Sequence, residues 1–257
     1  NADHHIDAWA QRYDWETRPV PHCPTGYWVI RSPQPVSQTI EHRLGFYYIQ
    51  DAASMLPAEL FDLDGLEEPL VLDMAASPGG KTTHLISRLG DRGLVLANDS
   101  SADRITALRI VLQNYGAINT AVARFPGEKY GAWYPETFDR VLLDAPCSMQ
   151  GLKTTDSHPM RPITAREQES LARRQARLLD SAFQAVKTGG QVVYAFRPQG
   201  SGPLVQHIRS MPVGSYSFSY TSSLESDWGR RFLPLDVEVY LHSRSGRDST
   251  NYFAPLQ

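Results

Sequence analysis

Short aliphatic runs alternate with helical patterns from residue 69 onward, and this alternation is the main structural signal in the chain. Because apolar residues follow one another in these runs instead of alternating with polar ones, the runs are typical of strands covered on both faces. Residues 216–220 and 237–242 are further predicted strands that would add an antiparallel edge. The order of strands and helices predicts an α/β fold with a doubly wound, mostly parallel sheet. The aliphatic runs are residues 69–75 (PLVLDMA), 93–98 (GLVLAN), 138–145 (FDRVLLDA) and 190–196 (GQVVYAF).

Two of the intervening segments carry signals for the start and end of a helix. Residues 100–116 place apolar side chains at helical spacing, with a serine at the start as a cap and Gly116 at the end. Residues 164–190 open with Thr164 and Glu167, which have the spacing of a capping box, and close on two glycines. Both segments are therefore predicted to be helices that cover the sheet.

Residues 1–50 follow a different pattern and are predicted to form a small α+β appendage to a main domain of residues 51–257. Residues 2–15 suit a short helix, and residues 16–31 suit two strands around a turn rich in proline and glycine. Residues 46–61 resemble an apolar helix that a proline interrupts.

Composition narrows the class of protein without fixing its function. Of 257 residues, 41% are hydrophobic and 21% are charged, and the net charge is −3. These values are ordinary for a soluble domain and give no overall attraction to nucleic acid or to an anionic membrane. A local basic groove remains compatible with them.

Cysteine usage and the absence of long apolar runs bear on location. Only Cys23 and Cys147 are present, which indicates a reducing compartment rather than a disulfide framework. No apolar run approaches the roughly 20 residues of a membrane span, and the first residues lack a signal-peptide pattern. We therefore predict a cytoplasmic protein without membrane contact, and we interpret the start at Asn1 as that of a fragment or trimmed product.

Histidine spacing gives no sign of a metal site. The chain has eight histidines, and none is spaced as in a metal-binding motif. His22 stands beside Cys23 but lacks further ligands. The sequence therefore predicts no metal.

Candidate chemistry gathers where three predicted strands end. Residues 71–85 combine a strand, a turn of small residues and a helix that begins near Lys81. The turn matches neither the G-x-G-x-x-G pattern nor the phosphate loop, which argues against a dinucleotide or a triphosphate. Asp99 follows the next strand, where an acid can accept hydrogen bonds from ribose hydroxyls. Asp144 and Cys147 follow a third strand, and ligands of such sheets bind at these carboxyl ends.

The motifs at these strand ends resemble those of one enzyme family. DMAASPGGKTTHL (73–85), LANDSSADR (96–104) and LLDAPCSMQG (142–151) together resemble the Nop/Sun family of RNA cytosine-C5 methyltransferases. The resemblance is closest to the bacterial RsmF-type enzymes that modify small-subunit (16S) ribosomal RNA. It extends to two upstream stretches and runs from about residue 9 to 195. Those stretches are YDWETRPVPHCPTGYWV (13–29) and GFYYIQDAASMLP (45–57).

The resemblance implies a Rossmann-like class I methyltransferase fold, S-adenosylmethionine as cofactor and RNA, specifically small-subunit ribosomal RNA, as partner. It also implies an RNA-binding role for residues 1–50. Asp144 would contact the target cytosine, because a carboxyl group can bond the N4 and N3 edge of an extruded base. The resemblance implies that Asp144 also contributes to the cofactor site. The other residues implied to bind the cofactor are Ala76, Pro78, Gly79 and Lys81 at its methionine end, Asp99 on the ribose and Arg104 nearby.

The sequence departs from this family at its active centre. Cytosine C5 becomes nucleophilic only after a thiolate has added to C6, and the family supplies that thiolate from a cysteine after the last strand. Arg197 occupies the matching position here. Pro126 stands near the place of an acid beside the adenine, and Thr154–Thr155 replaces an Arg–Lys pair.

These departures leave the role of Cys147 and the activity itself open. Three interpretations of Cys147 stay open: a substitute nucleophile, a residue that assists product release or is the vestige of one, and a plain buried cysteine. The leading prediction is an RNA cytosine-C5 methyltransferase. The alternative is a catalytically inactive, RNA-binding or ribosome-assembly factor on the same scaffold.

Two surface features have a functional and a structural interpretation. Arg166, Arg173 and Arg177 fall on one side of the long predicted helix, where they would either follow an RNA backbone or form an ordinary solvated face. The aromatic residues of the first segment, among them Trp9 and Trp15, would either stack on unpaired bases or pack a small core. The structural interpretation is preferred for both.

Overall fold

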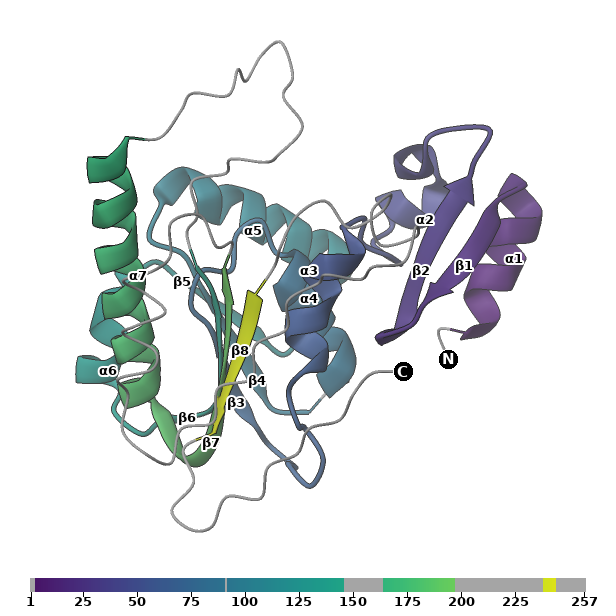
Figure 1. The fold of residues 1–257 in the computed structure, drawn as a ribbon. Helices are drawn as coiled ribbons and strands as arrows, with labels where there is room; N and C mark the ends of the chain where they lie inside the picture. The colour runs from purple at the N-terminus through teal and green to yellow at the C-terminus, as the bar shows by residue number, and fades with distance from the viewer. Residues whose placement is uncertain (1–2, 91, 146–163, 197–237, 244–257) are drawn as a thin grey trace.

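The computed structural model describes residues 3–90, 92–145, 164–196 and 238–243, and these form a six-stranded sheet with helices on both faces and a two-stranded appendage (Figure 1). The strand order is β5-β4-β3-β6-β7-β8; the first five strands are parallel and β8 is antiparallel to β7. This confirms the predicted doubly wound sheet. The strands are β3 (Leu70–Asp73), β4 (Leu94–Asn98), β5 (Thr120–Ala123), β6 (Phe138–Asp144), β7 (Val186–Phe196) and β8 (Glu238–Ser243).

Alternate side chains of the central strands enter two separate hydrophobic cores. Val71 and Leu142 face the core that α3, α4 and α5 cover, whereas Leu72 and Leu143 face the core that α7 covers. All four side chains are fully buried. Figure 1 shows α7 on one side of the sheet and α4 on the other. The helices are α3 (Ala52–Glu59), α4 (Gly80–Leu89), α5 (Ala102–Tyr115) and α7 (Ala165–Ala185), with the short η2 (Gly127–Lys129) and α6 (Tyr130–Trp133) before β6.

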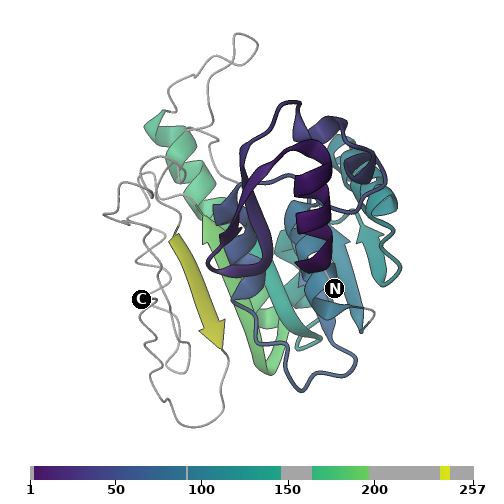
Figure 2. The ribbon, with the colours of Figure 1, turned by 90° about the vertical axis from the view of Figure 1, so that its right-hand side faces the viewer.

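The amino-terminal segment forms the predicted helix and hairpin. It lies on the side of α3 and α4, away from α7 (Figures 1 and 2). Val20 and Cys23 of the hairpin pack against Ala52 and Met55 of α3, so the appendage and the main unit share a small core. The boundary predicted at residue 50 stays a prediction. The elements of the segment are α1 (Asp3–Tyr13), β1 (Glu16–Val20), β2 (Cys23–Arg31), η1 (Val36–Gln38) and α2 (Ile40–Arg43).

The structure confirms the predicted helix caps, whereas several other element boundaries differ from the predicted ones. Ser101 caps α5 and Gly116 ends it in a left-handed conformation, while Thr164 and Glu167 form a complete capping box on α7. However, α7 ends at Ala185, and β7 begins four residues earlier than the aliphatic run indicated.

Two further elements differ from their prediction. The helix predicted over residues 46–61 forms only from Ala52. The strand β5 was missed because it has four half-buried residues and no aliphatic run. Residues 237–242 form the predicted antiparallel edge within one residue, whereas residues 216–220 lie outside the described ranges.

Among the described helices, none combines the length and apolarity that a membrane span requires.

Candidate functional site

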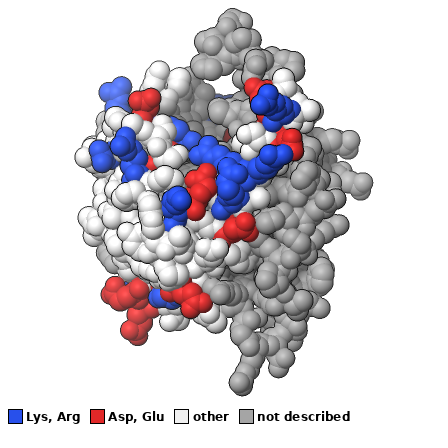
Figure 3. All heavy atoms as spheres, turned by 90° about the vertical axis from the view of Figure 1, so that its left-hand side faces the viewer, with Lys and Arg blue, Asp and Glu red and all other residues white. Residues whose placement is uncertain are grey.

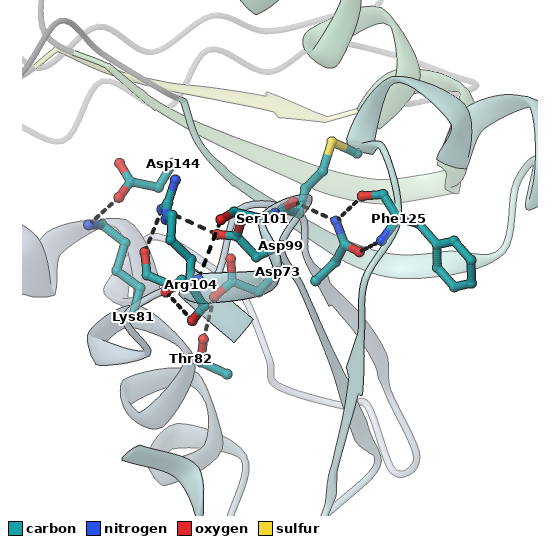
Figure 4. A network of polar contacts seen from close by, with 11 residues as sticks. Asp73, Lys81, Thr82, Asp99, Ser101, Arg104, Phe125 and Asp144 are labelled. Atoms are coloured by element: carbon teal, nitrogen blue, oxygen red, sulfur yellow. Dashed lines mark hydrogen bonds and ion pairs between the residues drawn. The ribbon is translucent and has the colours of Figure 1, made fainter. Parts of the chain in front are cut away.

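Three neighbouring parallel strands bring their carboxyl ends, and an acid on each, to one edge of the sheet. Asp73 ends β3, Asp144 ends β6, and Asp99 directly follows β4. In the sheet, β3 lies between β4 and β6, which is where the strand order reverses. Such a reversal point is the usual ligand site of a doubly wound sheet. Figure 4 shows the three carboxyl groups on this edge together with Lys81 and Arg104.

The turn between β3 and α4 is held by both neighbouring strands. The Met74 amide donates to the Leu142 carbonyl at 2.9 Å, and the Ala76 amide donates to the Asn98 carbonyl at 2.8 Å. Gly79 has φ +120°, a conformation that side chains disfavour, and a Cβ there would lie 2.9 Å from Val111. Glycine is therefore required at this position so that the start of α4 can lie against α5.

A polar cavity of about 200 Å³ opens beside this turn. The start of α4 contributes to its wall, and the first N–H groups of a helix lack intrahelical acceptors and favour a negative group. Four of the residues predicted from the sequence, Ala76, Pro78, Lys81 and Asp144, line the cavity. The complete lining is Tyr48, Ile49, Gln50, Asp51, Ser54, Asp73, Ala75, Ala76, Ser77, Pro78, Gly80, Lys81 and Asp144.

Lys81 and Asp144 form an ion pair across the cavity. The Lys81 Nζ donates to Asp144 Oδ2 at 2.7 Å, and the side chains are 17% and 42% exposed. At that exposure the pair contributes little to stability, since solvent screens it. Its effect is geometric: Lys81 holds one carboxylate oxygen of Asp144, and the exposed carboxylate can still meet a ligand.

Asp73 is fully buried and is the ionisable group most altered by its surroundings at this edge. Removal from water raises the pKa of its carboxyl group to about 7, and the nearby Asp144 raises it too, while a hydrogen bond from Thr82 and the charge of Lys81 oppose the rise. Thr82 donates to Oδ2 at 2.7 Å. Among the described residues, Oδ1 has no hydrogen-bond partner. A donor on a bound ligand would satisfy this oxygen.

Asp99, Arg104 and Gly79 were predicted to join the site but do not line the cavity. The Asp99 carboxyl accepts from the Ser101 amide at 2.9 Å and pairs with Arg104 at 3.2 Å. Arg104 donates to the Ser77 carbonyl, and Ser77 Oγ donates to the Arg104 carbonyl, both at 2.8 Å. Because Ser77 lines the cavity, this pair of bonds connects Asp99 with it (Figure 4).

Asn98 fixes the next strand end to the turn. Its side-chain amide donates to the carbonyls of Met74 and Phe125 at 3.0 and 3.1 Å, and its oxygen accepts from the Phe125 amide at 2.9 Å. The residue is fully buried. It therefore positions the loop after β5, which contains Pro126, against the turn after β3.

Nine of the thirteen residues that line the cavity were not predicted from the sequence, and Asp73, Tyr48 and Gln50 are three of them. Asp73 was within a quoted motif but was given no role, although a strand-end acid is a recognisable signal. Tyr48 and Gln50 come from the segment before α3, and no local pattern marks them as cavity residues. Cys147, Arg197 and the pair Thr154–Thr155 lie outside the described residues.

The arginines of α7 are mixed with acids. Arg173 pairs with Glu169 at 2.5 Å, and Arg174 pairs with Glu128 at 3.2 Å. Figure 3 shows blue and red side chains interspersed on the face that α7 helps to form. This arrangement favours an ordinary solvated face. In the amino-terminal segment the ring centroids of Trp9 and Tyr47 lie 5.4 Å apart. This contact favours packing of the aromatic rings against one another over stacking on bases.

Comparison with known proteins connects the chain to methyltransferases. The model of the 16S rRNA methyltransferase RsmB/F family matches residues 61–197. Ribosomal RNA small subunit methyltransferase F of Salmonella paratyphi B is 41% identical over 186 residues, which are 71% of this chain and 39% of that protein. The chain thus spans about two-fifths of the length of such curated relatives.

Solved structures agree on the fold. A methyltransferase homolog from Pyrococcus horikoshii superimposes with a TM-score of 0.76 at 23% identity, covering 95% of this chain and 83% of that one. NSun6 from Pyrococcus horikoshii gives a TM-score of 0.65 at 23% identity, covering 82% and 56%. The chain therefore has a Rossmann-like class I methyltransferase fold.

The matched residues 61–197 make up more than half of the chain and contain the glycine turn and all three strand-end acids. This chain therefore belongs to the 16S rRNA methyltransferase RsmB/F family.

Proposed function

We propose that this chain transfers a methyl group from S-adenosylmethionine to carbon 5 of a cytosine in small-subunit ribosomal RNA. The observation that carries the proposal is that the ends of β3 and β6 line one polar cavity, to which Arg104 and Ser77 connect Asp99 directly after β4. Family membership supports methyl transfer to ribosomal RNA, and we propose that the reaction takes place in the cytoplasm.

The residues at the strand ends fit S-adenosylmethionine, which supplies an activated methyl group when bound. Oδ1 of Asp73, which has no hydrogen-bond partner within the described ranges, suits the amino group of its methionine end, and the start of α4 suits the carboxylate. We assign Ala76, Pro78, Gly79 and Lys81 to that end as well. Asp99, with Arg104 over it, is assigned to the ribose hydroxyls.

Asp144 is assigned to the target base. It is the most exposed of the three acids, and the Lys81 ion pair fixes one of its oxygens. A carboxyl group held in this way can bond the amino edge of an extruded cytosine. Attack on C6 requires a thiolate, and with Arg197 at the family's nucleophile position Cys147 is our candidate for it.

Cofactor binding tests the first half of the proposal. Calorimetry with S-adenosylmethionine should show binding that Asp99→Ala weakens at least tenfold, because the ribose loses its acceptor. Asp103→Ala is the matched control, since Asp103 is an exposed acid in the first turn of α5. Equal affinities of both variants and the unchanged chain would refute the assignment of Asp99.

Methyl transfer tests the second half. The chain is incubated with labelled S-adenosylmethionine and small-subunit RNA, and the labelled nucleoside is identified after digestion. We expect 5-methylcytidine, with yields reduced at least tenfold by Asp144→Ala and abolished by Cys147→Ala. Full turnover in Cys147→Ala would exclude that thiol as the nucleophile. Cofactor and RNA binding without any label in the RNA would support the inactive factor instead, an alternative that the named relatives, all methyltransferases, do not favour.

A further inference from the structure

A second group of reactive side chains lies away from the cavity of the proposed methyl-transfer site. It consists of Cys23 at the start of β2, Glu59 at the end of α3 and His84 in α4. One ligand atom from each residue lies within 4.8 Å of the other two. The residues are 25 to 61 positions apart in the sequence, so only the fold brings them together.

The group is almost completely removed from solvent. Cys23 is 2% exposed, and the side chains of His84 and Glu59 are 5% and 14% exposed. A thiol, an imidazole and a carboxylate are the donor types that bind zinc in proteins. Together they favour a borderline cation such as Zn²⁺ over Mg²⁺ or Ca²⁺, which prefer oxygen ligands only.

The distance between the Cys23 and His84 donor atoms agrees with a tetrahedral metal centre. The distance between the Glu59 and His84 donor atoms is shorter, so Glu59 would have to move slightly. With Zn–S of about 2.3 Å and Zn–N of about 2.0 Å, tetrahedral S and N donors lie about 3.6 Å apart. Cys23 Sγ lies 3.6 Å from His84 Nε2. Glu59 Oε1 lies 2.7 Å from the same nitrogen, so its carboxylate would move outward by roughly 0.6 Å on binding.

Neighbouring residues hold the donors in place. Arg88 Nε lies 3.3 Å from Glu59 Oε2, and its guanidinium also donates to the backbone carbonyls of Ala58 and Phe61. Arg88 therefore fixes one carboxylate oxygen and leaves Oε1 directed at His84, as residues around a metal site often do. Thr25 Oγ1 lies 3.7 Å from Cys23 Sγ, within hydrogen-bonding range of sulfur.

Space for a further ligand lies next to the group. Cys23, Thr25 and His84 line a cavity of about 430 Å³ between the amino-terminal segment and α4. Water in that cavity can reach Cys23 and His84. Three protein ligands plus one water complete a four-coordinate zinc centre.

We propose that Cys23, Glu59 and His84 bind one zinc ion whose fourth ligand is water. The ion connects the hairpin, α3 and α4, and it thereby stabilises the attachment of the amino-terminal segment. On binding, the Cys23 thiol and the protonated His84 imidazole each release one proton to solvent, so that a thiolate and a neutral imidazole coordinate the ion. The site is independent of S-adenosylmethionine and RNA.

Cobalt titration of the purified full chain, stripped of metal with a chelator, tests the site. Co²⁺ is the probe because a thiolate ligand gives it an intense near-ultraviolet band. Cys23 and Cys147 are the only cysteines, which makes Cys147→Ser the matched control for Cys23→Ser. We expect saturation at one equivalent in the unchanged chain and in Cys147→Ser, loss of the band in Cys23→Ser, and at least tenfold weaker binding in Glu59→Gln and His84→Gln.

Thermal unfolding with Zn²⁺ gives the second measurement. One equivalent of Zn²⁺ should raise the Tm of the unchanged chain and of Cys147→Ser, and leave that of Glu59→Gln nearly constant. Absence of a thiolate band in the folded, unchanged chain would overturn the proposal and leave a hydrogen-bonded network of Cys23, Glu59 and His84. A band that Cys147→Ser removes would overturn it too. Since neither cofactor nor RNA is present, the result is separate from the outcome for methyl transfer.

Discussion

Asp73 illustrates how position within the sheet alters a single side chain. Its carboxyl group ends the central strand, is fully buried and accepts a hydrogen bond from Thr82. Burial disfavours the charged form, so the pKa is raised to about 7. A carboxyl group with a raised pKa in the folded state stabilises the fold only while it is protonated in that state, below its folded pKa.

We therefore expect stability to fall as the pH rises from about 4 to 7, because the folded state holds the Asp73 proton more tightly than the unfolded chain does. The difference between 3.8 and about 7 corresponds to roughly 4 kcal/mol at most. Asp73→Asn removes this contribution while keeping an acceptor for Thr82. Urea unfolding at pH 4 and pH 8 measures the free energy of unfolding of both chains. The value for Asp73→Asn relative to that of the unchanged chain should be higher at pH 8 than at pH 4.

Asp103→Asn, at an exposed acid, provides the control for that experiment and should not change the pH dependence. If the free-energy difference between Asp73→Asn and the unchanged chain is the same at both pH values, the burial argument for Asp73 is wrong.

At the level of single elements, α7 depends on both its start and its apolar face. The Thr164 side chain accepts from the Glu167 amide, and the Glu167 carboxylate accepts from the Thr164 amide at 2.9 Å. Leu178, Leu179 and Ala182 are buried against the sheet, whereas the first turns are exposed. Since the first turns have little packing to hold them, the capping box is their main local support.

Thr164→Ala should lower the free energy of unfolding by about 1 kcal/mol, because the amide of Glu167 loses its acceptor. Thr164→Ser keeps a hydroxyl at the same place and should restore most of the loss. Chemical unfolding of the three chains makes the comparison. A Thr164→Ser chain as unstable as Thr164→Ala would show that the cap contributes nothing.

At the scale of the whole molecule, the amino-terminal segment depends on close backbone contact with the main unit. Gly45 packs against α5, and a Cβ at this position would lie 1.8 Å from the Asn114 carbonyl oxygen. Its φ of +77° is also unfavourable for other residues. The proposed zinc site and the Gly45 contact therefore both attach the same segment.

Gly45→Ala should destabilise the protein more than Gly65→Ala does. Gly65 has nearly the same φ, +72°, but nothing lies within 4 Å of a Cβ there. Gly65→Ala, the control, should lower the free energy of unfolding by about 1–2 kcal/mol because of its backbone conformation. The clash in Gly45→Ala should lower it by roughly 1–3 kcal/mol more. Equal losses in unfolding free energy would mean that the Gly45 contact is not formed.

The sequence pattern predicted four of the five parallel strands, the glycine turn, the caps of α5 and α7, and the acids Asp99 and Asp144 at two strand ends. These features depend on local spacing and on the rule that parallel strands end at one edge, so a linear pattern is sufficient for them. The same local reasoning misplaced the end of α7, because β7 pairs with Phe138 and Arg140 of β6, and this pairing extends the strand over residues whose own preference is weak.

Tertiary structure alone decided which side chains share an environment. Tyr48 and Gln50 line the cavity, the Asp73 pKa rises, and Cys23 meets Glu59 and His84, although the sequence predicted no metal site around Cys23. Each of these depends on contacts between residues tens of positions apart. Burial and donor geometry are sums over such distant neighbours, and no local pattern of hydrophobic and polar residues contains them.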